Sequence, residues 1–228
     1  MTLLLVALEN TWRDGYTDEL VKAIGQTLLM VAATLLVGGL LGLVAGLALY
    51  ATRRGGLFKN RPLFLALNFL VNTIRPIPFI IFLTAVRPLT IAVTGHSVGV
   101  EAAVFPMVIV CTMATSRLVE QSLVGTDPGI VEAGRAMGAS RLHVLVFILI
   151  PEALAPLILG YAFLFIGVLD MSAMAGAIGA GGLGTFALSY GYNKYNDYVT
   201  WASLAIIIVI VQIVQAFGNS LARRVLHK

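Results

Sequence analysis

Charged side chains are scarce in this chain of 228 residues. Lysine, arginine, aspartate and glutamate make up 11% of it, whereas ordinary globular chains carry about 25% charged residues. Apolar residues make up 59%, and several long runs hold no charge. This composition excludes an ordinary water-soluble domain and is typical of a polytopic, all-α membrane protein. The net charge of +4 does not indicate nucleic-acid binding, because most basic residues flank apolar runs, where they set membrane orientation.

Residues and motifs that support catalysis or metal binding are also few. The single cysteine, Cys111, lies in an apolar run and excludes an intrachain disulfide or a multi-cysteine metal site. The three histidines fall in different segments, so we predict no metal site. The phosphate-binding pattern G-x-x-x-x-G-K-[ST] is missing, and the chain should not bind ATP in that way. Because no acid–base cluster is found either, we predict that the chain is not an enzyme and holds no cofactor.

The apolar runs predict five membrane-spanning helices, each with room for about 20 helical residues. The expected ranges are 23–51, 62–86, 98–116, 151–170 and 198–222. In the first, Gly38, Gly42 and Gly46 recur every four residues and form a smooth stripe, against which another helix can pack closely. Pro76 and Pro78 interrupt the second.

Residues 171–193 also lack charge, but we do not predict a sixth span there. Six glycines fall in this run and give its backbone more freedom than an unsupported helix in lipid tolerates. With five spans, ten of the fifteen lysines and arginines lie on one side of the membrane, which is then the cytoplasmic side. A sixth span would move the basic C-terminal tail to the outside.

This topology divides the chain into three parts. Residues 1–22 form an external segment that is partly interfacial, and no cleaved signal peptide is expected because the segment lacks a basic region followed by a cleavage site. Residues 23–222 form the membrane domain, in which residues 117–150 are a cytoplasmic loop. Residues 223–228 form a basic cytoplasmic tail.

The loop contains a patterned, polar stretch, residues 127–150, which we call the elbow. Asp127 can cap a helix whose first residue is Pro128, and Gly138 can take the left-handed conformation that ends it. Ser140 can cap a second helix, from Arg141 to about Leu149. The pattern therefore predicts two short helices folded against each other.

One face of the first elbow helix has the properties of a docking surface. Ile130, Gly134 and Met137 share this face at helical spacing. Ala133 and Gly134 keep it shallow, so that a partner protein can approach closely. Pro151 forces a break before the fourth span and makes the elbow stiff. A partner that pushes on the elbow would therefore move a membrane helix.

The elbow also carries a spaced motif: Glu132-Ala133-Gly134, then Gly138, then Ile148-x-Ile150-Pro151. This motif resembles the EAA loop of ABC importer permeases, which has Glu-Ala-Ala, three residues, Gly, nine residues and Ile-x-Leu-Pro. Gly134 replaces the second alanine and Ile150 the leucine. We expect neither replacement to abolish docking. The resemblance implies a type I ABC importer permease fold, with a five-span core over nearly the whole chain.

Two further segments narrow the resemblance. Residues 72–81, Asn-Thr-Ile-Arg-Pro-Ile-Pro-Phe-Ile-Ile, are similar to the second-span signature of methionine-uptake permeases. Residues 172–184, followed by Tyr190-Gly191-Tyr192, are also similar to that family. These segments do not determine a substrate physically. The resemblance implies D- or L-methionine, and the alternative is an ABC permease for another small amino acid or organic solute.

The resemblance also implies partners. Such a permease forms a homodimer in the bacterial inner membrane, and two cytoplasmic ATPase subunits bind ATP and Mg²⁺. An external substrate-binding protein delivers the substrate. ATP closes the ATPase pair, the elbows are drawn together, and the two sets of helices rock outward.

Four residues are candidates for the translocation path or its gate. Arg75 would lie about 21 Å from Arg61 along a straight helix, inside the apolar slab. It would contact a substrate carboxylate or satisfy carbonyls freed by the two following prolines. Met174, flanked by small residues, could close a narrow path or simply pack. Met171 and Tyr190 are weaker candidates.

Glu132 is expected to orient the elbow, by pairing with Arg135, with Arg141 or with backbone N–H groups. A catalytic role is not expected, because no nucleophile or second carboxylate lies nearby.

An ion-coupled secondary transporter is the main alternative from another class. Such folds generally have internal repeats and intramembrane carboxylates, whereas this sequence has no repeat and its acids near spans lie at span ends.

Overall fold

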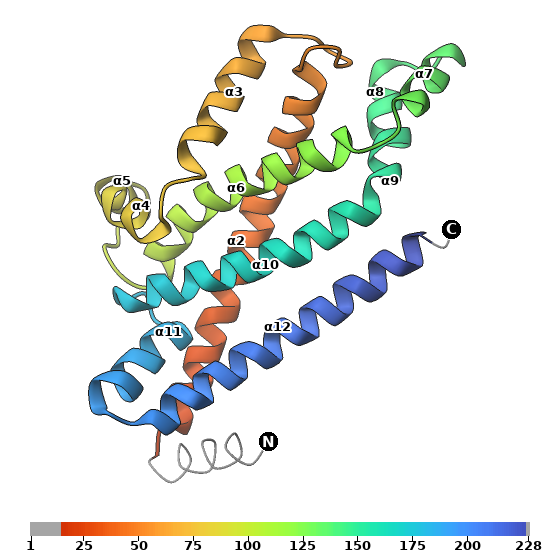
Figure 1. Ribbon diagram of the computed structural model, residues 1–228. Coiled ribbons are helices and arrows are strands. Elements are labelled where there is room, and N and C mark those ends of the chain that lie inside the picture. The colour runs from red at the N-terminus through yellow and green to blue at the C-terminus, as the bar shows by residue number, and fades with distance from the viewer. Residues whose placement is uncertain (1–14, 227–228) are drawn as a thin grey trace. The chain divides into compact units, whose positions relative to one another are not determined.

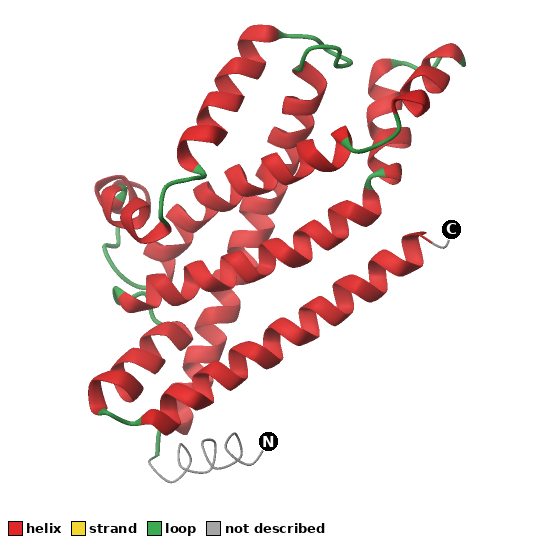
Figure 2. Ribbon diagram, in the orientation of Figure 1, coloured by secondary structure: helices red, strands yellow, loops and turns green. Residues whose placement is uncertain are grey.

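The computed structural model describes residues 15–226, which contain helices and no strands (Figure 2). Four helices are long and apolar enough to cross a membrane. They are α2 (Thr17–Thr52), α6 (Val100–Val124), α10 (Leu154–Ala177) and α12 (Asp197–Leu226). A fifth span results if the broken pair α3 (Arg61–Ile74) and α4 (Phe79–Ala85) counts as one. Of the predicted terminal segments, residues 1–14 and 227–228 lie outside the described part.

The chain divides into two compact units. Within the described residues, the first consists of residues 15–36, 78–109 and 165–214, and the second of residues 37–77, 110–164 and 215–226. Each of the four long helices in Figure 1 therefore contributes one end to each unit. The break between α3 and α4, at the predicted prolines, coincides with a boundary between the units.

All four long helices extend beyond the predicted ends of their spans; α2 starts at Thr17 and α12 ends at Leu226. Helix α6 continues from residue 116 to Val124, through Arg117 and Glu120. These opposite charges pair with each other, so they do not end the helix as a sequence reading assumes. Helix α10 continues from residue 170 to Ala177 and uses part of the run that we expected to be non-helical.

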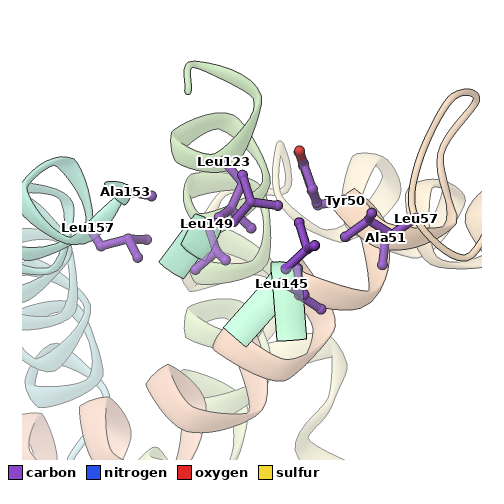
Figure 3. Packing of buried hydrophobic residues seen from close by; sticks show 10 residues of the cluster. Tyr50, Ala51, Leu57, Leu123, Leu145, Leu149, Ala153 and Leu157 are labelled. Carbon is purple, nitrogen blue, oxygen red and sulfur yellow. The ribbon is translucent and has the colours of Figure 1, made fainter. Parts of the chain in front are cut away.

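The second unit is built around close approach of α2 and α6. A Cβ atom on Gly46 would lie 2.6 Å from the carbonyl oxygen of Ser116, and one on Gly42 would overlap Thr115. The predicted glycine stripe is thus confirmed at these two positions. The same unit contains a core of buried side chains from the end of α2, the end of α6 and the segment after α7 (Figure 3).

The first unit contains the glycine-rich connection between α10 and α12. After α10 the chain forms α11 (Gly182–Phe186), a π-helical turn (Ala187–Gly191) and a 3₁₀ turn (Tyr192–Lys194). The backbone N–H of Gly182 donates to Gln26 Oε1 at 2.8 Å, and that of Leu183 to Thr27 Oγ1 at 2.8 Å. The connection therefore packs back onto α2, and its short elements do not form a separate span.

Candidate functional site

The first half of the elbow is helix α7 (Pro128–Ala136). The side chain of Asp127 accepts a hydrogen bond from the Gly129 N–H at 2.8 Å, and Pro128 occupies the first turn. An acidic N-cap satisfies a free N–H group and opposes the positive end of the helix dipole. The predicted start of the elbow helix is confirmed.

The elbow turns at Gly138, whose φ of +81° is in the left-handed region that glycine tolerates. The N–H of Gly138 donates to the Arg135 carbonyl at 3.0 Å, and the N–H of Ala139 to the Gly134 carbonyl at 3.1 Å. Ser140 Oγ then accepts from the His143 N–H at 3.2 Å. These bonds end one helix and start the next within four residues, which fixes the bend.

The second half of the elbow is not a regular α-helix. It consists of α8 (Arg141–His143), a π-helical turn (Val144–Leu149) and α9 (Ile150–Glu152). The N–H of Ile150 reaches back five residues to the Leu145 carbonyl. The π turn ends at Leu149, two residues before Pro151, which has no N–H to continue the ladder. Helix α10 starts after this break, at Leu154.

The second half of the elbow is anchored by apolar packing. Three side chains of this half, Val144, Leu145 and Leu149, are buried in a core with Leu123 of α6 and Tyr50 of α2. We call this cluster the elbow core. Figure 3 shows labelled members of this core from the ends of α2 and α6, from the elbow and from the start of α10. A displacement of the elbow must therefore be passed to the ends of α2 and α6 in the same unit.

The predicted docking face is wrong in one respect. Gly134 is buried, because a Cβ there would lie 2.9 Å from Ile148 Cδ1 and 3.4 Å from Val144 Cγ2. The small residue lets α7 pack against the other half of the elbow, so this face is covered by the chain itself. Ile130 is half-buried, whereas Met137 is 79% exposed. A partner would meet Met137, Glu132 and Ala133, all exposed.

The structure also contradicts the predicted pairing of Glu132. This side chain is exposed, and among residues 15–226 it forms neither an ion pair nor a hydrogen bond to a backbone N–H. Arg135 and Arg141 instead line a hollow of about 410 Å³ with residues 56–60. The carboxylate of Glu132 is thus available to a partner.

A polar network in the second unit was missed by the sequence reading. Arg117 donates to Glu120 Oε2 at 2.5 Å, to Asn68 Oδ1 at 3.0 Å and to Asn72 Oδ1 at 2.5 Å. Glu120 is only 7% exposed. The network joins α6 to α3 beside the elbow core. The signal in the sequence was two asparagines four residues apart in a predicted span, which share one helix face.

The path candidates fall in different units. Arg75 lies in the second unit, exposed, as the residue that ends α3. Met171 and Met174 lie in the first unit on α10; Met171 is buried, and Met174 is 36% exposed. Tyr190 packs in an aromatic group, with its ring centroid 5.0 Å from that of Tyr16. This contact favours a packing role for Tyr190.

A hollow of about 270 Å³ is present in the first unit. Its lining comes from α4, α5 (Arg87–Thr94), the start of α6 and the end of α10. The polar side chains in the lining are those of Thr84, Arg87, Thr90 and Ser97. None of Met171, Met174 and Tyr190 belongs to this lining, so the hollow does not bring the first-unit candidates together.

Comparison with known proteins shows the family to which the chain belongs. The family model for binding-protein-dependent transport system inner membrane components matches residues 38–227. The chain is 38% identical over 217 residues to the probable D-methionine transport system permease protein MetI of Vibrio cholerae, covering 95% of this chain and 96% of that protein. It is 36% identical over 157 residues to the Escherichia coli (strain K12) D-methionine transport system permease protein MetI, covering 69% and 72% of the two chains.

Solved structures agree with the sequence comparison. A structure of inward-facing conformations of the MetNI methionine ABC transporter matches with a TM-score of 0.89 and 36% identity, over 92% of this chain and 98% of that chain. An amino acid ABC transporter matches with a TM-score of 0.78 at 20% identity, which supports the fold alone. The predicted type I ABC importer permease fold is confirmed. The chain, a multi-pass membrane protein, therefore belongs to the family of binding-protein-dependent transport system inner membrane components.

Proposed function

We propose that this chain is the membrane-spanning permease subunit of an ATP-driven importer of methionine, in the D or the L form. The likeness that carries this proposal is the 38% identity to a probable D-methionine permease over 95% of the chain. The permease moves substrate and is not itself the ATPase. The elbow supplies a surface through which a separate ATPase acts.

The functional assembly contains a second copy of this chain, two cytoplasmic ATPase subunits and an external substrate-binding protein. ATP and Mg²⁺ bind to the ATPase subunits. The likeness to the MetNI methionine ABC transporter supports this assembly. The missing phosphate-binding pattern in this sequence also supports it, because hydrolysis must then reside in another polypeptide.

The N-terminus faces outward, and the elbow and the basic C-terminal tail face the cytoplasm. The distribution of lysine and arginine supports this orientation, since ten of the fifteen fall on the proposed cytoplasmic side. The elbow then lies where a cytoplasmic ATPase can reach it.

In the proposed cycle the ATPase contacts the exposed side of α7, at Glu132, Ala133 and Met137. ATP-driven closure of the ATPase pair displaces the two elbows of the dimer. Because the elbow core is packed against the ends of α2 and α6, the helices move with it. The bundle changes between two states, biased by ATP on one side and by the binding protein on the other.

Met174 is proposed as a gate residue and Arg75 as a contact in the path. The partial exposure of the flexible Met174 thioether supports a role as a gate. Its neighbours on α10 are small: Ala173, Ala175 and Gly176. The position of Arg75 supports a contact in the path. This residue is exposed at the end of an apolar helix, where a charged group must face protein or water.

Reconstituted vesicles test the proposal directly. The chain is assembled with its ATPase and binding protein, and uptake of radiolabelled L- and D-methionine is measured with and without ATP. We expect ATP-dependent uptake that unlabelled methionine abolishes and that other amino acids do not. Uptake that runs on an ion gradient without ATP would contradict the permease assignment. ATP-driven uptake of a different solute alone would contradict the methionine assignment.

A further inference from the structure

We propose that the junction between α2 and α3 binds the headgroup of an anionic phospholipid. A hollow of about 490 Å³ lies where α2 ends and α3 begins. Its lining contains four cationic side chains, followed by two apolar ones at the start of α3. The lining residues are Thr52, Arg53, Arg54, Lys59, Arg61, Phe64 and Leu65.

The charge of this hollow is not balanced within the chain. No aspartate or glutamate occurs between Glu19 and Glu101. None of the four cations forms an ion pair with a carboxylate of the described residues. Four uncompensated cations in one hollow attract an anion, and clusters of lysine and arginine next to a membrane helix bind anionic lipids.

The cations are presented by an ordered segment. The N–H of Phe58 donates to the Ala51 carbonyl at 2.8 Å, and the N–H of Asn60 to the Thr52 carbonyl at 3.1 Å. Leu57 is buried, 4% exposed, in the elbow core. These contacts fold residues 53–60 back onto the end of α2, so the site is preformed.

One of the cations contacts a neighbouring side chain, and a second lies at a capped helix end. The Arg53 guanidinium stacks on the Tyr50 ring, 4.4 Å from its centroid, and Tyr50 is buried. Arg61 starts α3, whose first turn is capped by the Asn60 side chain through the Leu63 N–H at 3.2 Å. The Arg53 side chain is therefore held in place, and Arg61 projects from a fixed backbone position.

The apolar side of the hollow favours a lipid over a soluble anion or a protein. Leu65 lies in the lining at 53% exposure, and Phe69, one turn further along α3, is 68% exposed. Helix α3 thus continues from the cations into an exposed apolar surface. A phospholipid matches both features, with its phosphate at the cations and its acyl chains along α3. A zwitterionic choline headgroup would add a cation to a site that already holds four.

Lipid binding by the purified, full-length chain tests this proposal. Native mass spectrometry measures the affinity for phosphatidylglycerol and for phosphatidylcholine in the wild type and in Arg54→Gln/Lys59→Gln. At about fivefold per cation, we expect the double variant to lose about 25-fold in affinity for phosphatidylglycerol. The matched control, Arg223→Gln/Arg224→Gln, removes the same charge from the last turn of α12 and should change the affinity less than about twofold.

Several outcomes would overturn the proposal. They are an absence of phosphatidylglycerol preference in the wild type, equal losses in both double variants, or displacement of the lipid by inorganic phosphate at equal concentration. Binding of the ATPase subunit to Arg54→Gln/Lys59→Gln is measured as well. If this variant keeps its preference for phosphatidylglycerol but no longer binds the ATPase, the cations contact the ATPase and the lipid proposal is wrong. If the double variant does not fold, Arg54→Lys/Lys59→Arg, which keeps both charges, must retain the preference. The readout needs neither ATP nor methionine, so its result is independent of the proposed transport function.

Discussion

The two ends of α10 are held by different kinds of contact. In the second unit, the elbow that leads into α10 is anchored by large buried side chains, among them Leu145 and Leu149. In the first unit, the end of α10 meets the glycine-rich connection by backbone contact. A Cβ on Gly184 would overlap the Ala173 carbonyl and lie 2.8 Å from the Ala173 Cα.

This difference separates a part suited to movement from a part suited to fixed geometry. Side chains in an apolar core can change rotamer yet remain close-packed, so they pass a shift on to the neighbouring helix. Two backbones in contact have no side chain that can yield. The elbow is therefore fitted to follow a partner, whereas the glycine-rich connection holds α10, α11 and α2 of the first unit in one arrangement.

The largest expected effect comes from breaking the part-buried network beside the elbow. Glu120→Leu leaves the Arg117 charge without its carboxylate, and the loss of a hydrogen bond between charged groups costs about 1.5–3 kcal/mol. Denaturant unfolding of the purified chain in detergent measures this loss. The double variant Arg117→Met/Glu120→Leu removes both charges and should recover much of the stability. A single variant as stable as the double would contradict the role of the pair.

The next effect tests the backbone contact. Gly184→Ala forces a methyl group into the Ala173 backbone, and overpacking of this kind costs about 1–3 kcal/mol. Gly167→Ala, on α10 with open space around its Cβ position, is the matched control and should be neutral or stabilising by up to about 1 kcal/mol. Thermal unfolding compares the two. Equal melting temperatures would show that the connection is not rigid.

A smaller effect is expected from the exposed side of the elbow, because it involves no packing. Glu132→Lys should leave the free energy of unfolding within about 0.5 kcal/mol and the dimer intact. Coupled methionine uptake should fall at least about tenfold, which corresponds to about 1.4 kcal/mol, while ATP hydrolysis continues. Gly138→Pro should also uncouple uptake, and it should lower stability as well, because proline cannot adopt a φ of +81° and has no N–H to donate to the Arg135 carbonyl. Normal coupled uptake in both variants would refute the assignment of the elbow.

The smallest effect is expected where the elbow itself uses a glycine. Gly134→Ala places a Cβ against the flexible end of Ile148, which can move by a few tenths of an ångström. We expect a loss below about 1 kcal/mol in thermal unfolding. Gly134→Leu is the contrasting variant and should separate the two halves of the elbow, with a loss above that of Gly134→Ala. Equal stability of the two variants would mean that this face is open after all.

The local features of the elbow were predictable from the sequence. Caps and left-handed glycines act on their immediate neighbours, so Asp127, Gly138 and Ser140 determine where the elbow helices start and end. The helix break at the two prolines after Arg75 and the glycine stripe of α2 follow from equally local rules. The spaced motif then led to the permease family.

The features that depend on distant residues were not predictable. Helical spacing predicts a docking surface at Gly134, because nothing in α7 alone indicates that Val144 and Ile148 cover it. The hydrophobic pattern predicts a loop at Arg117, because its partners Asn68 and Asn72 lie more than forty residues away in the chain. In both cases, contacts with residues distant in the sequence determine the burial or the secondary structure of the residue, and the spacing along one helix does not.

Disulfide crosslinking tests the central claim that the elbow carries movement from an ATPase. In a Cys111→Ala background, Met137→Cys places a thiol at the exposed bend of the elbow, and Phe163→Cys places one on an equally exposed position of α10. The assembled complex contains ATPase subunits with a cysteine introduced in turn across their membrane-facing surface. We predict crosslinks from Met137→Cys, with a yield that changes on ATP addition, and none from Phe163→Cys. Failure of Met137→Cys to crosslink to any ATPase position would contradict the account.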